Sequence, residues 1–244
     1  MTVSNTLPLP RLDLIPGTLC DARLWASLEQ ELAGHASFHH IPLQQAGTRQ
    51  QMQGMITAHS AAQSHLVGFS LGAYLALEHA VHHPERIASL TLIANSAKGL
   101  APEEIATRKR VIALLERNSY AGITRQRLRE LLHPDHLDHS AITDLIRAMA
   151  LDLGKDVLLA QFAQTFDRPD LMERLPGLPF PVLIVGAQGD QLVASSDLAA
   201  MAERLPRATL HLLQAPSGHM IPLEAPGELA RAMFDFLNGL RSGA

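Results

Sequence analysis

The sequence predicts an α/β protein in which a six-stranded, mostly parallel sheet is flanked by helices and carries an inserted helical segment. Apolar runs of strand length alternate with helix-length amphipathic segments, which is the pattern of parallel strands joined by crossover helices. Glycine or proline stands at most of the strand ends. Hydrophobic residues make up 47 % of the 244 residues and aromatic residues only 4 %, which is typical of a buried aliphatic sheet in one large domain.

The six strands are predicted from short apolar runs that end in turn residues. Pro16-Gly17 follows the first run, Pro42 ends the second, and Gly186-Ala187 ends the fifth. The predicted strands cover residues 11–15, 37–42, 64–69, 88–95, 181–186 and 208–213.

Helical periodicity is clearest at residues 71–83 and 226–240, which we expect to lie on the sheet. Residues 97–175 contain no strand-like run, and they separate two strands by far more than the roughly dozen residues that a crossover needs. We therefore assign residues 1–96 and 176–244 to the core and interpret residues 97–175 as an inserted helical lid. Its amphipathic stretches are residues 103–117, 124–132, 141–153 and 157–166.

Composition excludes several classes of protein. The formal net charge of −4 leaves no basic footprint, so we expect no nucleic-acid partner and no membrane surface. Cys20 is the only cysteine, so no intrachain disulfide forms and a reducing compartment is suitable. The start of the chain, Met1 to Arg11, lacks the pattern of a signal peptide. These observations predict a cytoplasmic protein.

A glycine-bounded motif, Gly68-Phe69-Ser70-Leu71-Gly72, lies between a predicted strand and a predicted helix. A strand that turns directly into a helix holds its corner residue at strained, positive φ and brings the residues two before and two after it together, where glycine fits. The corner serine then stands above the carboxyl edge of the sheet. The backbone N–H of Leu71, at the helix N-terminus, faces any developing oxyanion. This context predicts that Ser70 is a nucleophile.

Two further residues complete a candidate catalytic triad. An activated serine needs a base, and His219 follows the last predicted strand on the same sheet edge as Ser70. A carboxylate should then orient the imidazole, and Asp190 follows the strand at 181–186. Asp197 is the nearest competitor, but Asp190 is favoured because it lies directly at the strand end.

Three stretches carry motifs of one known superfamily: residues 14–25, 82–87 and 218–226. With them the chain resembles the α/β-hydrolases, and within these the small bacterial carboxylesterases of the pimeloyl-carrier-protein methyl ester esterase type. The first stretch, which ends on Trp25, resembles the oxyanion loop of that family. The resemblance implies the α/β-hydrolase fold over nearly the whole chain outside the insertion, and it implies that the backbone N–H of Thr18 is the second oxyanion donor.

The chain departs from the family pattern in four places. Pro16 replaces the common histidine of the oxyanion motif, and the spacing from Gly186 to Asp190 is one residue longer than expected. Residues 41–45 lack the aspartate that is usual after the second core strand. The two opening antiparallel strands of the family have no room, because the first strand begins near Arg11.

The predicted function is hydrolysis of a carboxylic ester through an acyl-enzyme on Ser70, without a cofactor. One alternative is hydrolysis of a carbon–carbon bond or an enol lactone with the same triad. A non-enzymatic alternative is a ligand-sensing member that keeps the triad but acts by binding. The complete triad favours turnover. We expect a small ester or acyl substrate of short to medium chain, and a monomer or homodimer.

Apolar residues near the predicted site and in the insertion are candidates for the substrate pocket, although core packing of the insertion explains the latter equally well. The predicted pocket residues are Leu19, Phe69, Met149, Phe162, Phe166 and Met220.

Two other signals are discounted. His133, His136 and His139 recur at three-residue spacing and suggest a metal site, but they fall in a predicted turn of the insertion, so a solvated connection is preferred and no metal is predicted. Cys20 lies beside the oxyanion loop and is interpreted as a small buried residue.

Overall fold

Six strands form one sheet in the computed structural model, which describes residues 9–242. Their spatial order is β2-β1-β3-β4-β5-β6, and every neighbouring pair is parallel. The predicted six-stranded sheet is confirmed, and over the described residues it is wholly parallel. The predicted core range also takes in residues 1–8 and 243–244, which lie outside the described residues. The strands are β1 Arg11–Ile15, β2 Ser37–His40, β3 Ser64–Phe69, β4 Ile87–Ile93, β5 Val182–Ala187 and β6 Ala208–Leu213.

Two strands end earlier than predicted. β2 ends at His40, two residues short of Pro42, because proline has no N–H to continue a ladder. β4 ends at Ile93 instead of residue 95, because Ala94 takes a φ of 50° and turns the chain out of the strand.

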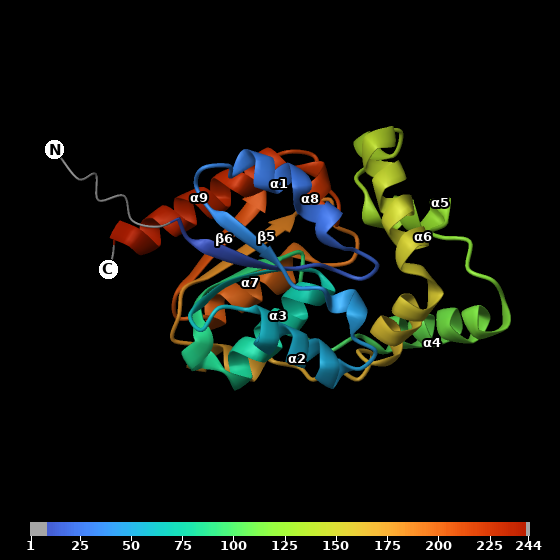
Figure 1. Cartoon of the computed structure of the whole chain (residues 1–244), viewed down its shortest axis with the longest axis horizontal. Helices are drawn as coiled ribbons and strands as arrows, with labels where there is room; N and C mark the ends of the chain where they lie inside the picture. The colour runs from blue at the N-terminus through green and yellow to red at the C-terminus, as the bar shows by residue number, and fades with distance from the viewer. Residues whose placement is uncertain (1–8, 243–244) are drawn as a thin grey trace.

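Helices cover both faces of the sheet (Figure 1): α1, α8 and α9 lie on one face and α2, α3 and α7 on the other. The predicted helix over residues 71–83 is α3, and that over 226–240 is α9. None of the helices among residues 9–242 is long and apolar enough to cross a membrane. The helices are α1 Ala26–Glu31, α2 Arg49–His59, α3 Leu71–His82, α4 Pro102–Arg117, α5 Arg125–Leu131, α6 Ser140–Ala163, α7 Ser195–Arg204, α8 Ile221–Glu224 and α9 Pro226–Ser242, with 3₁₀ segments η1 Ala22–Trp25, η2 Leu43–Gln45, η3 Pro84–Arg86, η4 Pro134–His136 and η5 Met172–Gly177.

The core consists of two apolar layers separated by the sheet. Successive side chains of a strand point to opposite faces, so Val67 and Phe69 of β3 join the layer under α1 and α9. Leu66 of the same strand joins the layer under α2, α3 and α7. Because both faces are covered, the strands are near-continuous apolar runs, and their carboxyl ends form a rigid edge on which loops can be positioned.

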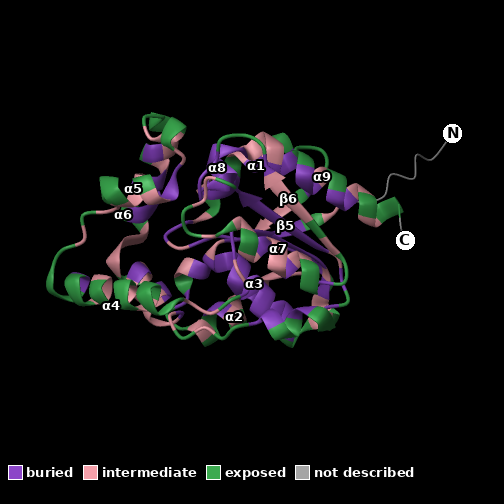
Figure 2. Cartoon of the chain, turned by 180° about the vertical axis from the view of Figure 1, so that it is seen from behind, coloured by how far each residue is buried: buried purple, intermediate pink, exposed green. Residues whose placement is uncertain are grey.

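The segment between β4 and β5 holds α4, α5 and α6 and, as predicted, no strand. The stretches predicted at 141–153 and 157–166 fall in one long α6, which ends at Ala163, three residues earlier than predicted. It is interrupted at Gly154, where φ is 77° and ψ is −175°. Figure 2 shows exposed residues along the outer side of α4. Leu171 N donates to Ala97 O over 2.9 Å at the base of the segment, and Leu175 packs in the core layer of α3. The last residues of the predicted insertion therefore pack with the core, and a lid role for the rest stays a prediction.

Candidate active site

The turn from β3 into α3 has the strained geometry that the glycine pattern predicts. Ser70 has φ 51° and ψ −114°. A Cβ on Gly68 would lie 2.5 Å from Ala73 Cα, and one on Gly72 would lie 2.3 Å from Ile15 O. Gly68 thus permits the end of β3 to lie against the first turn of α3, while Gly72 permits the approach of α3 to the end of β1.

Strained backbone is concentrated around this serine. The non-glycine residues with positive φ in the described chain are Leu19, Ser70 and Ala94, at 52°, 51° and 50°. They follow β1, β3 and β4, which are neighbours in the sheet. Such conformations persist where the surrounding structure over-determines them, as at functional sites. The carboxyl edge at these three strands is therefore the candidate site.

Ser70, His219 and Asp190 are joined by hydrogen bonds. His219 Nε2 lies 2.8 Å from Ser70 Oγ, and His219 Nδ1 lies 2.9 Å from Asp190 Oδ2. The imidazole is 5 % exposed and the carboxylate 1 %, whereas Ser70 is half-buried. This is the order of contacts that lets an imidazole take the serine proton while the carboxylate fixes its tautomer.

Local turns also orient the acid. Asp190 Oδ1 accepts bonds from Leu192 N at 2.8 Å and Val193 N at 3.1 Å, so its other oxygen is left for His219. The extra residue after Gly186 is accommodated by a turn in which Asp190 N donates to Ala187 O over 3.3 Å. The competitor Asp197 instead bonds Lys98 Nζ at 2.6 Å. The structure therefore brings Asp190, and not Asp197, to the histidine.

The backbone N–H groups of Thr18 and Leu71 have no acceptor among the described residues. The next N–H after Thr18 is engaged, because Leu19 N donates to Gln161 Oε1 over 2.9 Å. Cys20 N donates back to Gly17 O over 3.2 Å, which closes a tight turn around Thr18. Both residues predicted to bind an oxyanion thus keep a free donor.

Cys20 is not poised as a nucleophile. It is 4 % exposed, and burial together with the charge of Asp21 raises the pKa of its thiol to about 12. Because the thiolate is the reactive form, Cys20 is a small buried residue of the loop that follows β1.

The histidine-rich turn of the insertion lies against the loop that carries His219. His133 N and His136 Nδ1 contact Glu224 Oε2 at 2.8 and 3.0 Å, while His139 is exposed. Among residues 9–242 no group of three His, Cys, Asp or Glu side chains is arranged to hold a metal ion.

Five of the six predicted pocket residues lie in two apolar clusters, and Phe69 shares the core layer of Met149 and Met220. The Phe69 ring lies 5.3 Å from the His219 ring, centroid to centroid, and so borders the triad. Leu19 packs in a small apolar cluster with Phe162 at its margin, and Met149 and Met220 are buried in the core layer under α1 and α9. Phe166 lies outside both clusters. Lys109 Nζ lies over its ring, 5.3 Å from the centroid.

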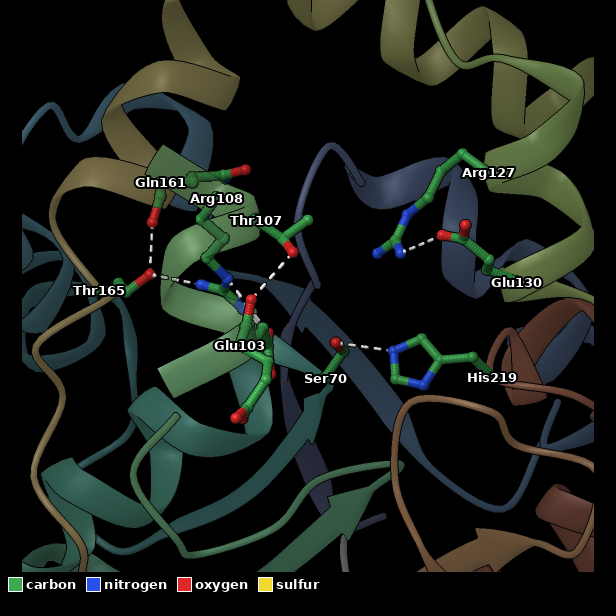
Figure 3. A network of polar contacts seen from close by, with 10 residues as sticks. Ser70, Glu103, Thr107, Arg108, Arg127, Glu130, Gln161, Thr165 and His219 are labelled. Atoms are coloured by element: carbon green, nitrogen blue, oxygen red, sulfur yellow. Dashed lines mark hydrogen bonds and ion pairs between the residues drawn. The ribbon is translucent and has the colours of Figure 1, made fainter. Parts of the chain in front are cut away.

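Two polar networks of the insertion are seen above the serine and histidine in Figure 3, where Ser70 and His219 face each other. In one network, Arg127 Nη1 bonds Glu130 Oε2 at 2.9 Å. In the other, Arg108 Nη1 bonds Thr165 Oγ1 at 3.2 Å. Each network thus includes a charged side chain of α4 or α5.

Concavity alone does not select this site. A groove of about 890 Å³ runs along β6 and α9, and Thr209 and Arg231 are among the residues that line it. None of the three triad residues lines this groove. We assign the site by the contacts of Ser70, His219 and Asp190, because a general base must lie within hydrogen-bond distance of the group whose proton it takes.

Sequence reasoning missed three residues that hold the site loops: Glu224, Gln161 and Gln191. Gln191 Nε2 donates to Arg129 O over 3.0 Å and so ties the acid loop to α5. Glu224 gave one usable signal, a lone carboxylate within the apolar run from Ile221 to Ala225, which predicts a buried and bonded charge. Gln161 gave none, because its partner is 142 residues away.

A parallel six-stranded sheet with a serine at a strained β3–α3 turn, and with Ser, His and Asp in contact at its carboxyl edge, defines an α/β-hydrolase-fold protein. The chain belongs to the Ndr family, whose model matches residues 46–242. The sequence motifs pointed to the superfamily and not to this family within it.

Individual relatives are moderately similar. A 2-hydroxy-6-oxononadienedioate/2-hydroxy-6-oxononatrienedioate hydrolase of Burkholderia vietnamiensis is 24 % identical over 193 residues, which cover 76 % of this chain and 66 % of that enzyme, just under two thirds of its length. A pimeloyl-acyl-carrier-protein methyl ester esterase of Aeromonas salmonicida is 26 % identical over 231 residues, with 85 % and 88 % covered. The structure of a thermophilic esterase from Thermogutta terrifontis superimposes with a TM-score of 0.81 at 22 % identity, covering 96 % of this chain and 90 % of that one.

Proposed function

We propose that the protein is a serine hydrolase that cleaves a carboxylic ester through an acyl-enzyme intermediate. The observation that carries the proposal is the continuous chain of contacts from Ser70 Oγ to His219 Nε2, at 2.8 Å, and from His219 Nδ1 to Asp190, at 2.9 Å. A serine hydroxyl is a weak nucleophile until a neighbouring base takes its proton. Similarity to a methyl ester esterase over 85 % of the chain supports an ester as the substrate.

The proposed cycle uses each triad member in turn. Ser70 Oγ attacks the carbonyl carbon while His219 takes its proton, and His219 then protonates the leaving alcohol. A water molecule, deprotonated by His219, hydrolyses the acyl-enzyme. Asp190 stays ionised and stabilises the imidazolium.

The negative charge that develops on the carbonyl oxygen would be met by the N–H groups of Thr18 and Leu71. Both donors lack a protein acceptor among the described residues, and Leu71 begins α3, where the helix dipole adds positive potential. Each such donor contributes about 3 kcal/mol to transition-state stabilisation. We propose this pair as the oxyanion hole.

A second candidate is hydrolysis of a carbon–carbon bond or an enol lactone by the same triad. The similarity to a hydrolase named for 2-hydroxy-6-oxononadienedioate favours it. Both candidate reactions use Ser70 as the nucleophile and differ in the substrate that the pocket must bind. Activity assays with substrates of each type therefore separate them.

The test is steady-state turnover of p-nitrophenyl esters of increasing chain length by the wild type and by Ser70→Ala. We expect multiple turnovers for the wild type and a loss in kcat of about a million-fold for the variant, the effect of removing a triad serine. Circular dichroism and the melting temperature should stay unchanged, because Ser70 is half-buried and its side chain is small.

Carrier-protein esters, lactones and dienones complete the substrate series. Turnover of dienones or lactones alone would replace the ester assignment with the second candidate. A single burst of product without further turnover would indicate a ligand-sensing protein instead.

A further inference from the structure

We propose that Glu224 is a positioning residue for His219, and that it works together with His136 of the insertion. The inference rests on the proposed function, in which His219 is the base. Glu224 lies in α8, five residues after His219. Its carboxylate does not contact the triad side chains, but it bonds the backbone of the loop that carries His219.

The Glu224 carboxylate is fully buried, at 0 % side-chain exposure. Burial of a charge is costly unless hydrogen bonds compensate it, and here four N–H groups do so. Gly218 N reaches both carboxylate oxygens at 3.1 Å, and Met220 N reaches Oε1 at 3.0 Å. His133 N and His136 Nδ1 reach Oε2 at 2.8 and 3.0 Å.

These bonds hold the backbone on both sides of the catalytic base, because Gly218 and Met220 are its chain neighbours. The N–H of His219 itself donates to Leu131 O at the end of α5, over 2.8 Å. Three consecutive N–H groups are therefore fixed by Glu224 and by the insertion. These bonds fix the backbone of His219 and thereby position its imidazole between Ser70 and Asp190.

The histidine loop and the insertion pack so closely that a side chain on the glycines between them would clash with the insertion. A Cβ on Gly218 would lie 2.6 Å from His133 N and 2.8 Å from Leu131 O. A Cβ on Gly189, next to the catalytic acid, would lie 2.9 Å from His133 Cδ2. The residues around His133 thus pack directly against both the base loop and the acid loop, so the insertion contributes to triad alignment at this point.

Glu224→Gln is the direct test. Oε1 and Oε2 each accept two or more N–H bonds, so in either orientation the new amide NH₂ would face N–H donors. We expect the loop to shift and kcat to fall by about 10- to 100-fold, the scale of a misplacement near 1 Å. KM should change little, because Glu224 is buried behind the histidine.

A fluorophosphonate probe measures the same effect on one chemical step. Ser70 Oγ forms a bond to phosphorus, the P–F bond breaks, fluoride leaves, and the serine proton passes to His219. The second-order labelling rate should fall in parallel with kcat. The low-field NMR signal of the proton between His219 Nδ1 and Asp190 should shift or broaden, since the 2.9 Å contact depends on ring placement.

Glu228→Gln is the matched control. Glu228 also binds backbone N–H groups of the loop before α8, those of Gln214 and Ala215 at 2.9 Å each, and it contacts His211. Its backbone partners, unlike those of Glu224, are not chain neighbours of His219. We expect a lower melting temperature for this variant, with labelling rate and NMR signal as in the wild type.

His136→Phe gives a second route if Glu224→Gln fails to fold. A phenyl ring replaces the imidazole and the donor to Glu224 is lost, so we expect a smaller fall in labelling rate and the same kind of NMR change. Wild-type labelling rate and signal in both folded variants, or in His136→Phe alone if the other is unfolded, would overturn the inference. A wild type that does not react with the probe at all would instead overturn the proposed function.

Discussion

At the scale of single residues, the site depends on how far its charges are removed from water. The Asp190 carboxylate and the His219 imidazole are nearly fully buried, so their hydrogen bond acts in a medium of low dielectric constant, where it is stronger than at the surface. The ion pair of Asp197 with Lys98 joins side chains that are 27 % and 47 % exposed, and such pairs contribute little. Two aspartates seven residues apart are therefore expected to differ greatly in their effect on catalysis.

Asp190→Asn should lower kcat by about 10⁴-fold, because the amide favours the wrong imidazole tautomer while leaving the geometry intact. Asp197→Asn, the control, should retain wild-type kcat. Steady-state kinetics on a p-nitrophenyl ester check both variants. Equal activities of the two would show that Asp190 is not the acid.

At the scale of elements, α3 combines the proposed oxyanion donor at its start with a buried interior. Every residue from Leu71 to Val81 is buried, including two polar ones. Glu78 is compensated by Arg49 and by Gln53, the latter at 2.8 Å. Neither ring nitrogen of His79 has a hydrogen-bond partner among residues 9–242. The helix thus carries a neutral histidine that the fold cannot protonate without cost.

Protein stability should therefore fall on mild acidification through His79. Burial, with the positive charges of His83 and Arg86, lowers the pKa of His79 from 6.5 to about 4. Below pH 6.5 the unfolded chain binds a proton that the folded chain does not, so the free energy of unfolding decreases down to pH 4 and this contribution then levels off. The full effect is about 3 kcal/mol.

Urea unfolding of the wild type and of His79→Leu, measured between pH 7 and 4, checks this contribution. The variant should show a shallower pH dependence, whereas replacing the exposed His139 by glutamine should leave the wild-type slope. Parallel curves for the wild type and His79→Leu would contradict the assignment.

At the scale of the whole molecule, the insertion contacts three loops of the site, those that carry His219, Asp190 and Thr18. Leu131 O holds the histidine loop, and Arg129 O holds the acid loop through Gln191. Gln161, 1 % exposed, holds Leu19 N in the proposed oxyanion loop. The insertion is therefore built into the support of all three loops, in addition to any role that it has in covering a substrate.

Gln161→Leu should weaken the oxyanion loop. The change leaves a buried N–H of Leu19 without an acceptor, at a cost of about 1 to 3 kcal/mol in stability, and it frees the turn that presents Thr18. We expect a lower melting temperature and a lower kcat with little change in KM. Gln126→Leu, at an exposed position of α5 whose side chain bonds only Glu130, is the control and should match the wild type in both assays.

The sequence by itself determined what depends on local pattern. The apolar runs predicted all six strands, because parallel strands buried on both faces leave a continuous apolar signature. The two glycines around Ser70 predicted the turn, because no Cβ fits at either position. Strand ends placed Ser70, Asp190 and His219 on one edge of the sheet, since parallel strands bring their carboxyl ends together.

Only the tertiary structure decided which distant groups support that edge. Asp190 and Asp197 both follow β5 in sequence, and the choice between them rests on which one the turn after Ala187 presents to His219. Gln161 and Glu224 bind backbone N–H groups of the site loops. Every residue except proline carries such a group, so residue type does not reveal which N–H is bound. Hydrophobic patterning fixes which face of an element is buried, but a hydrogen bond between segments more than 100 residues apart, such as that of Gln161, exists only once the chain has folded.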